Sequence, residues 1–192
     1  MNNSLFDRMT EAEVSLRLAE FLLDLPRSKG SVEVAIDGAS IALGDLQVFD
    51  IEGFLAVQSW QKTASEGSNR WTGTYKQSGK TLRVHSRSGL GDVVAVVGPN
   101  RLVAECKKGW LVPKKGSPER PLLATALGQA LLLKVTENDL VIAAVPDTEA
   151  SRKIATQWRE RPLVKKAGIR ICLVGQDGKV DGLSDLRSAT DL

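Results

Sequence analysis

Three residues in the middle of the chain, Asp92, Glu105 and Lys107, have the types and the spacing of a hydrolytic site. Asp92 precedes an apolar run, a turn with Pro99 at its centre follows, and a second apolar run leads into Glu105. Asp92 lies seven residues before Pro99 and Glu105 lies six after it, so a hairpin brings both carboxylates to the same end of the ribbon. Because side chains alternate along a strand, Glu105 and Lys107 point to one face.

These groups predict metal-dependent hydrolysis. The carboxylates of Asp92 and Glu105, together with the backbone carbonyl of Cys106, make a set of hard oxygen ligands suited to Mg²⁺ or Mn²⁺. A cation held there would supply Lewis-acid help and an activated water, and Lys107 would hold or deprotonate that water or stabilise phosphate charge. The alternative is that Asp92 is a turn residue and that Glu105 and Lys107 are an ordinary solvated pair at a strand end.

The elements that would position these residues follow from the periodicity of the chain. Residues 10–25 are predicted as a helix with one apolar face, and Thr10 followed by Glu13 predicts a capping box at its start. An Asp-Gly pair between two alternating runs predicts a hairpin over residues 32–43.

The second half of the chain alternates between helices and buried strands. Residues 121–135 are apolar nearly all round and are predicted as a buried helix. Residues 148–166 are predicted as a helix with a break near Pro162. This order is typical of an α/β or α+β fold with a mixed central sheet flanked by helices. With no repeat and no linker, residues 1–192 are predicted as a single domain.

The composition is that of an ordinary folded protein, with 42% hydrophobic and 26% charged residues in a chain of 192. No apolar run approaches the roughly 20 residues of a membrane span, and the N-terminus lacks the order of a signal peptide. We therefore expect a cytoplasmic protein with no membrane contact. Cys106 and Cys172 are expected to be reduced structural residues, and His85, the one histidine, cannot build a metal site alone.

The small net charge of +3 conceals an uneven distribution of charge. Residues 1–60 hold four basic and ten acidic residues, a net of −6, whereas residues 61–134 hold thirteen basic and four acidic residues, a net of +9. Such a basic block suits a polyanion, because each Lys or Arg near a phosphate releases counterions. The alternative is a solvated basic face with no partner.

The stretch from Asp92 to Lys107 resembles the PD-(D/E)XK nuclease superfamily, in which an Asp opens one strand and a Glu-x-Lys follows on the next. The resemblance covers residues 80–180 well, whereas residues 1–80 are divergent. It implies a restriction-endonuclease-like fold and a Mg²⁺-dependent deoxyribonuclease. Two departures limit the assignment of a subfamily: Gly91 stands where the family has the proline of its name, and Leu133 stands where one branch has a tyrosine.

The resemblance also implies further site residues. Gln129, on the helix that follows the motif, would support the site, and the alternative is a helix-surface residue. Members often contribute a Glu from the first helix, for which Glu13 is the best candidate as an additional metal ligand, with Glu20 one heptad further on. The alternative for both is a solvated helix residue.

The leading hypothesis is therefore a nuclease that hydrolyses phosphodiester bonds in DNA. Trp110 would either stack on a base or pack in the core. A non-catalytic nucleic-acid-binding or assembly module on the same fold is the alternative, and a structural subunit of a larger complex is a third interpretation. A homodimer is also open. The basic residues expected to contact the phosphate backbone are Arg83, Arg87, Lys108, Lys114 and Lys115.

Overall fold

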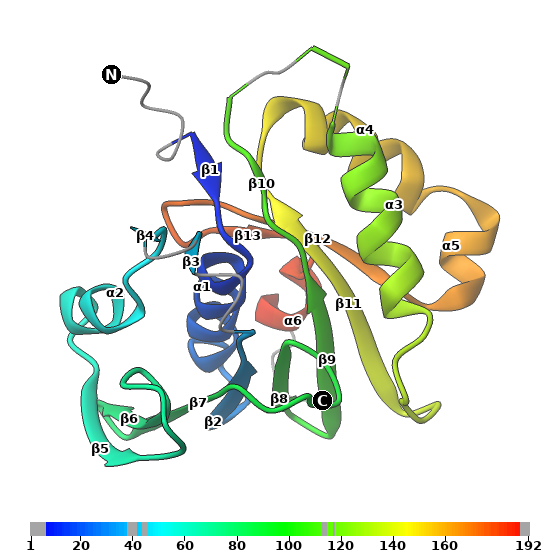
Figure 1. Ribbon diagram of the computed structural model, residues 1–192. Helices are drawn as coiled ribbons and strands as arrows, with labels where there is room; N and C mark the ends of the chain where they lie inside the picture. The colour runs from blue at the N-terminus through cyan, green and yellow to red at the C-terminus, as the bar shows by residue number, and fades with distance from the viewer. Residues whose placement is uncertain (1–6, 38–41, 44–45, 113–114, 117, 189–192) are drawn as a thin grey trace.

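A computed structural model describes residues 7–37, 42–43, 46–112, 115–116 and 118–188. Its centre is a nine-stranded sheet in the order β13-β12-β11-β9-β8-β2-β7-β6-β5, with helices packed on it (Figure 1). The sheet strands are β2 (Ser28–Ala35), β5 (Gln61–Ser65), β6 (Gly73–Gln77), β7 (Lys80–His85), β8 (Val93–Val97), β9 (Asn100–Cys106), β11 (Asp139–Pro146), β12 (Arg170–Val174) and β13 (Val180–Asp181).

The sheet is mixed, as the sequence predicts. β9 runs parallel to β11, β11 to β12 and β2 to β7. The remaining neighbours, β8–β9, β2–β8, β6–β7, β5–β6 and β12–β13, are antiparallel. β8 and β9 form the central hairpin, and β9 is therefore held between an antiparallel and a parallel neighbour.

The helices lie on both faces of this sheet. α1 packs against β2 and β8, while α3 and α4 pack against β11, β9 and β12 (Figure 1). The helix bounds are α1 (Glu11–Leu23), α2 (Ile51–Val57), α3 (Glu119–Ala130), α4 (Glu149–Arg159), α5 (Pro162–Ala167) and α6 (Ser184–Ser188).

Strand β11 shows how one apolar run serves two cores. Its side chains alternate, so Ile142 and Ala144 join the core under α1, whereas Val141, Ala143 and Val145 join the core under α3 and α4. A strand covered on both faces is apolar throughout. β11 is thus held between the two cores, and β9 pairs with it up to Cys106. This pairing positions the end of β9, where Glu105 and Lys107 lie.

Capping residues set the helix ends that matter for the site. The hydroxyl of Thr10 accepts a hydrogen bond from the backbone N–H of Glu13 at 3.1 Å and so starts α1 at Glu11. Thr148 caps α4 in the same way, and the predicted break at Pro162 is confirmed because α4 ends at Arg159 and α5 begins at Pro162.

Two predictions about elements are wrong. The strand at 32–36 does not pair with residues 42–43, because β2 has β7 on one edge and β8 on the other, while β3 (Ala42–Leu43) pairs with β4 (Leu46–Gln47). Residues 38–41 of that predicted hairpin lie outside the described residues. The helix predicted over 121–135 is not buried all round: α3 buries Leu123, Ala126 and Ala130 and exposes its opposite face.

A second, two-stranded sheet lies beside the central one. β1 (Arg8–Met9) pairs antiparallel with β10 (Gly109–Trp110), which joins the segment before α1 to the segment after β9. Within the described residues, no helix has the length and apolar character needed to cross a membrane.

Candidate active site

The β8–β9 hairpin brings Asp92 and Glu105 together at one end. Its register pairs Val97 with Asn100 and Val93 with Ala104, and Asp92 and Glu105 lie directly beyond this last pair, where both line the same cavity. Asp92 is fixed from both sides, since its backbone N–H donates to the carbonyl of Ala104 at 2.8 Å and its Oδ2 accepts from the backbone N–H of Cys106 at 2.7 Å. The predicted meeting of the two carboxylates at the same end of the hairpin is confirmed.

Gly91 is required by the close approach of the chain to β9 just before Asp92. A Cβ at position 91 would lie 2.8 Å from the carbonyl oxygen of Ala104 and 2.8 Å from a methyl group of Val103. Both contacts are too short for any residue with a side chain, so the close approach of the chain to β9 requires glycine here. The backbone leading into Asp92 is thus held tightly against the strand that carries Glu105.

Lys107 follows β9 and joins three elements. Its backbone N–H donates to the carbonyl of Ala144 in β11 at 2.9 Å. Its ammonium group lies 2.8 Å from Oε1 of Glu105 and 3.2 Å from Oε2 of Glu11, the first residue of α1. The side chains of Lys107 and Glu105 are only 15% and 14% exposed, which contradicts the alternative of an ordinary solvated pair.

The electrostatics of the cluster are unbalanced. Burial is the main cause that raises the pKa of Asp92 to about 7, with the charges of Glu105 and Glu11 adding to the rise and the hydrogen bond from Cys106 and the charge of Lys107 opposing it. Burial acts to lower the pKa of Lys107, but its hydrogen bond to Glu105 and the surrounding carboxylates outweigh burial and raise it. Three carboxylates therefore share one ammonium group.

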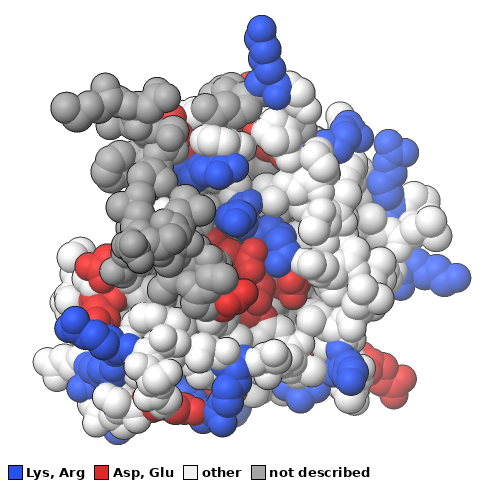
Figure 2. Space-filling view, in the orientation of Figure 1, with Lys and Arg blue, Asp and Glu red and all other residues white. Residues whose placement is uncertain are grey.

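Two hollows open on either side of the Lys107–Glu105 contact. The first, here called the carboxylate hollow, has a volume of about 420 Å³ and is lined by Asp92, Glu105 and the segments 35–37 and 86–89. The second, here called the tryptophan pocket, has a volume of about 350 Å³ and is lined by Glu11, Lys107, Trp110 and the start of α3. Figure 2 shows acidic side chains gathered in the middle of this face, between α1 and β9, with basic side chains directly beside them.

The glutamate from the first helix is Glu11 rather than Glu13. Glu13 is buried and forms an ion pair with Arg17 at 2.9 Å, one helical turn further along α1. Glu20 accepts a hydrogen bond from Trp60 at 2.9 Å and lies away from the cluster. Glu11 could have been found from its position as the first helical residue, because the helix N-terminus is the end that meets the end of β9.

The other residues implied for the site lie as follows. Gln129 is on the exposed face of α3 and lines neither hollow, whereas Leu133, four residues later, lines the carboxylate hollow. The thiols of Cys106 and Cys172 are reduced and buried. The N–H of Cys106 points to Asp92, and because the N–H and carbonyl of a strand residue share one side, its carbonyl also faces the β8 edge.

The basic residues expected to contact DNA are dispersed around this face. Arg83 is engaged with Glu33 at 3.1 Å and with Glu66 at 3.0 Å, and Arg87 pairs with the same Glu66. Arg87 also lines the carboxylate hollow. Lys108 is exposed at the tryptophan pocket, Lys115 is exposed, and Lys114 lies outside the described residues.

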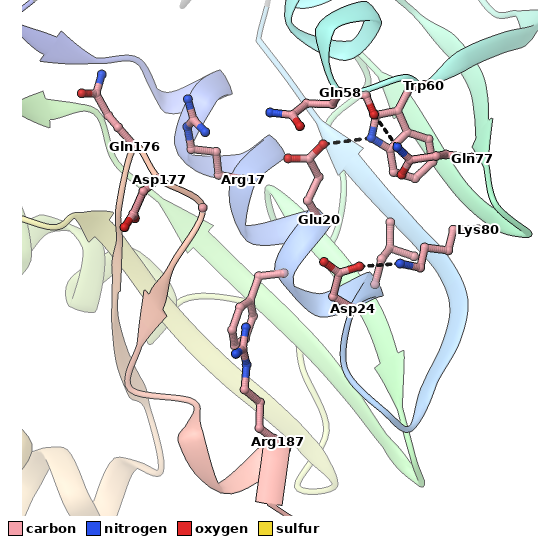
Figure 3. Close-up of a pocket in the computed structure, with 13 residues that line it drawn as sticks. Arg17, Glu20, Asp24, Gln58, Trp60, Gln77, Lys80, Gln176, Asp177 and Arg187 are labelled. Carbon is pink, nitrogen blue, oxygen red and sulfur yellow. Dashed lines mark hydrogen bonds and ion pairs between the residues drawn. The ribbon is translucent and has the colours of Figure 1, made fainter.

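A third hollow lies at the other end of α1 and differs in its chemistry (Figure 3). This Trp60 groove, about 410 Å³ in volume, is lined by residues of α1, β6 and β7 and by Gln176 and Arg187 from near the C-terminus. Both of its α1 carboxylates have donors inside it: Trp60 donates to Glu20, and Lys80 pairs with Asp24. We therefore take the Asp92 cluster, with its excess of carboxylates, as the candidate active site.

No group of three or more His, Cys, Asp or Glu side chains in the described part of the chain is arranged to hold a metal ion. A cation at this cluster would therefore depend on two carboxylates, a backbone carbonyl and ligands from water or substrate. Comparison with known proteins adds no relative, since no family model, no curated protein and no solved structure matches the chain.

Proposed function

We propose that this chain is a metal-dependent nuclease that hydrolyses phosphodiester bonds in DNA, with a core of the restriction-endonuclease-like type. The observation that carries the proposal is the joint position of Asp92, Glu105, Lys107 and Glu11 at one end of the β8–β9 hairpin. These four groups come from two sheet strands and the first helix, so the whole fold is needed to assemble them. A mere strand-end ion pair would not need this convergence.

The residues fit a divalent cation. Asp92 has its pKa raised to about 7 by burial and by Glu105 and Glu11, so the protein supplies too little positive charge for its own carboxylates. A cation beside Asp92 would correct this deficit. Mg²⁺ is commonly bound by only one or two carboxylates with water and substrate phosphate completing its shell, which is compatible with Asp92, Glu105 and the carbonyl of Cys106 as the protein ligands.

Each residue of the cluster has a separate role in the proposed reaction. The bound cation supplies Lewis-acid help and an activated water. Lys107, kept protonated at neutral pH by its carboxylate neighbours, donates hydrogen bonds to a phosphate oxygen or to the attacking water and offsets developing negative charge. Glu11 and Glu105 fix the position of the Lys107 ammonium group, and Gly91 holds Asp92 against β9.

The choice of DNA rests on charge and on the open surroundings of the site. The segment that contains the cluster carries a net charge of +9 over residues 61–134. Arg87 lines the carboxylate hollow and Lys108 lines the tryptophan pocket, so each hollow has a cation in reach of a phosphate backbone. Backbone contacts of this kind give affinity without a choice of sequence.

The test is cleavage of single-stranded, duplex and branched DNA with Mg²⁺, Mn²⁺ or EDTA. We expect cleavage that EDTA abolishes and that Lys107→Ala slows by at least about 100-fold, the effect of losing one preorganised donor. Lys153→Ala is the matched control, because Lys153 is an exposed lysine paired with Glu149 on α4. DNA binding without cleavage under any metal would overturn the proposal in favour of the non-catalytic binding module.

A further inference from the structure

The tryptophan pocket continues the candidate site on the side away from Asp92. Glu11 and Lys107 form its border with the site, and its far side is built by β10 and by the first two turns of α3. Gly109 lets these elements approach closely, because a Cβ there would lie 2.8 Å from a methyl group of Leu122. A phosphate held at Lys107 would therefore have this pocket as its immediate neighbour.

The walls of the pocket suit a flat ring. Trp110 is half-buried, and the guanidinium of Arg8 lies 3.7 Å from the centre of its ring, so an aromatic surface and a planar cation stand together at the pocket. Leu122 and two prolines add apolar surface. Its volume of about 350 Å³ falls within the roughly 300–1,000 Å³ of small-molecule sites.

One acidic group in the pocket has no partner. Glu119, the first residue of α3, is only 6% exposed, and none of the residues that the structure describes donates a hydrogen bond to its carboxylate or pairs with it. The helix N-terminus favours its negative charge, and its oxygens are not among the buried side-chain atoms that lack a partner, so solvent in the pocket reaches them. The pocket therefore presents a carboxylate acceptor that is open to a donor on a ligand.

We propose that the tryptophan pocket binds an unpaired nucleobase that carries an exocyclic amino group, with Glu119 accepting a hydrogen bond from that group. The proposal rests on the proposed nuclease function, because it places the base beside the phosphate at Lys107. A carboxylate distinguishes cytosine from uracil by this group alone, since cytosine offers an amino donor where uracil has a carbonyl. The substrate class is accordingly single-stranded DNA or a strand with an unpaired base.

The experiment measures binding in EDTA, so that it does not depend on cleavage. Short homopolymers of deoxycytidine and deoxyuridine are titrated against the protein at slightly alkaline pH. We expect deoxycytidine to bind about 10-fold tighter or more, as for one hydrogen bond to a charged group. Glu119→Gln should reduce this preference to about twofold, because its amide presents a donor as well as an acceptor. Glu137→Gln, the same change at an exposed position, should leave the preference unchanged.

A second ligand makes the test independent of any variant. Deoxycytidine with both amino hydrogens replaced by methyl groups should bind the unmodified protein no better than deoxyuridine. Equal binding of all three homopolymers, together with metal-dependent cleavage, would overturn the base pocket and leave the nuclease proposal standing. A preference for deoxycytidine without cleavage under any metal would instead overturn the nuclease proposal and retain the pocket as a base-binding site.

Discussion

The Asp92 cluster and the Trp60 groove lie at opposite ends of α1, and each contains a half-buried carboxylate whose pKa is raised. Glu11 marks one end and Asp24 the other, separated by roughly 20 Å of helix at about 1.5 Å per residue. At the Trp60 groove, burial raises the pKa of Glu20, while the hydrogen bond from Trp60 and the charge of Arg17 oppose that rise (Figure 3).

At the Asp92 cluster the charged neighbours act, on balance, in the other direction. Burial raises the pKa of Asp92, and there Glu105 and Glu11 add to the effect, leaving only a backbone N–H and Lys107 to oppose it. The difference indicates two uses of a buried acid. Glu20 and Asp24 have donors within the groove, whereas the carboxylates of the cluster share one ammonium group, so we expect the cluster to gain from a cation. Three measurements test whether the two acids differ in this way.

The largest effect expected is on the pH dependence of stability in the metal-free protein. The folded-state pKa of Asp92 is about 7, above the 3.8 of the unfolded chain. The group's contribution to stability is therefore fully present below about pH 4 and is lost as pH rises to about 7. Asp92→Asn removes the charge and keeps an acceptor for the Cys106 N–H. At pH 8 the variant should be more stable than the unmodified protein, by up to about 4 kcal/mol at roughly 1.4 kcal/mol per pKa unit.

Urea unfolding at several pH values in EDTA checks this expectation. The free energies of unfolding of the two proteins should coincide near pH 3.5 and diverge above it. Asp177→Asn, at an exposed aspartate, is the matched control and should show no stabilisation at pH 8. A variant that is less stable than the unmodified protein at every pH would mean that Asp92 is a satisfied structural residue, and the contrast with Glu20 would disappear.

A somewhat smaller effect is expected from the cation itself. A ligand that binds only the folded state adds about 2.7 kcal/mol of stability at a concentration of 100 times its Kd. Mg²⁺ or Mn²⁺ should therefore raise the Tm of the unmodified protein and of Glu20→Gln, but not that of Asp92→Asn. Thermal unfolding with and without metal measures this. An equal rise in Tm for all three proteins would indicate binding elsewhere on the chain.

The sequence predicted the part of the candidate site that is local in the chain. The position of Asp92 and Glu105 at the same end of the hairpin depends on one turn and on the pairing of two adjacent strands, so counting residues from Pro99 is sufficient. Glu11 was missed because its contact with Lys107 joins residues 96 positions apart and depends on how α1 packs on the sheet. Sequence spacing instead favoured Glu13, which the helix turns toward Arg17.

The same limit explains the errors in the fold. Local capping and backbone rules predict the helix starts at Thr10 and Thr148 and the break at Pro162. They do not predict the partners of β2, because β7 and β8 reach it from distant parts of the chain and displace the nearby hairpin that the local pattern favours. The exposed face of α3 likewise depends on which neighbours cover it, and the apolar composition of the helix does not specify them.

The smallest effect expected is at the groove, where the substitution changes the stability in the opposite direction to Asp92→Asn. Trp60→Phe removes the donor to Glu20 and should destabilise the protein by about 1–2 kcal/mol, near the lower end for a charged acceptor because the groove is open to water. The lost bond favours the charged form of Glu20, so the variant raises the pKa of Glu20 further. The destabilisation should therefore be present when Glu20 is ionised and fade as pH falls.

A double-mutant cycle of Trp60→Phe with Glu20→Gln isolates this interaction from the change in ring packing. The coupling free energy between Trp60 and Glu20 should grow between acid and neutral pH and should not change with Mg²⁺. The cost of ionising Asp92, which Asp92→Asn removes, should grow over the same interval, but Mg²⁺ should offset it. A coupling in the groove that responds to Mg²⁺ would contradict the difference between Glu20 and Asp92, because it would mean that a cation compensates the charge of Glu20 as well.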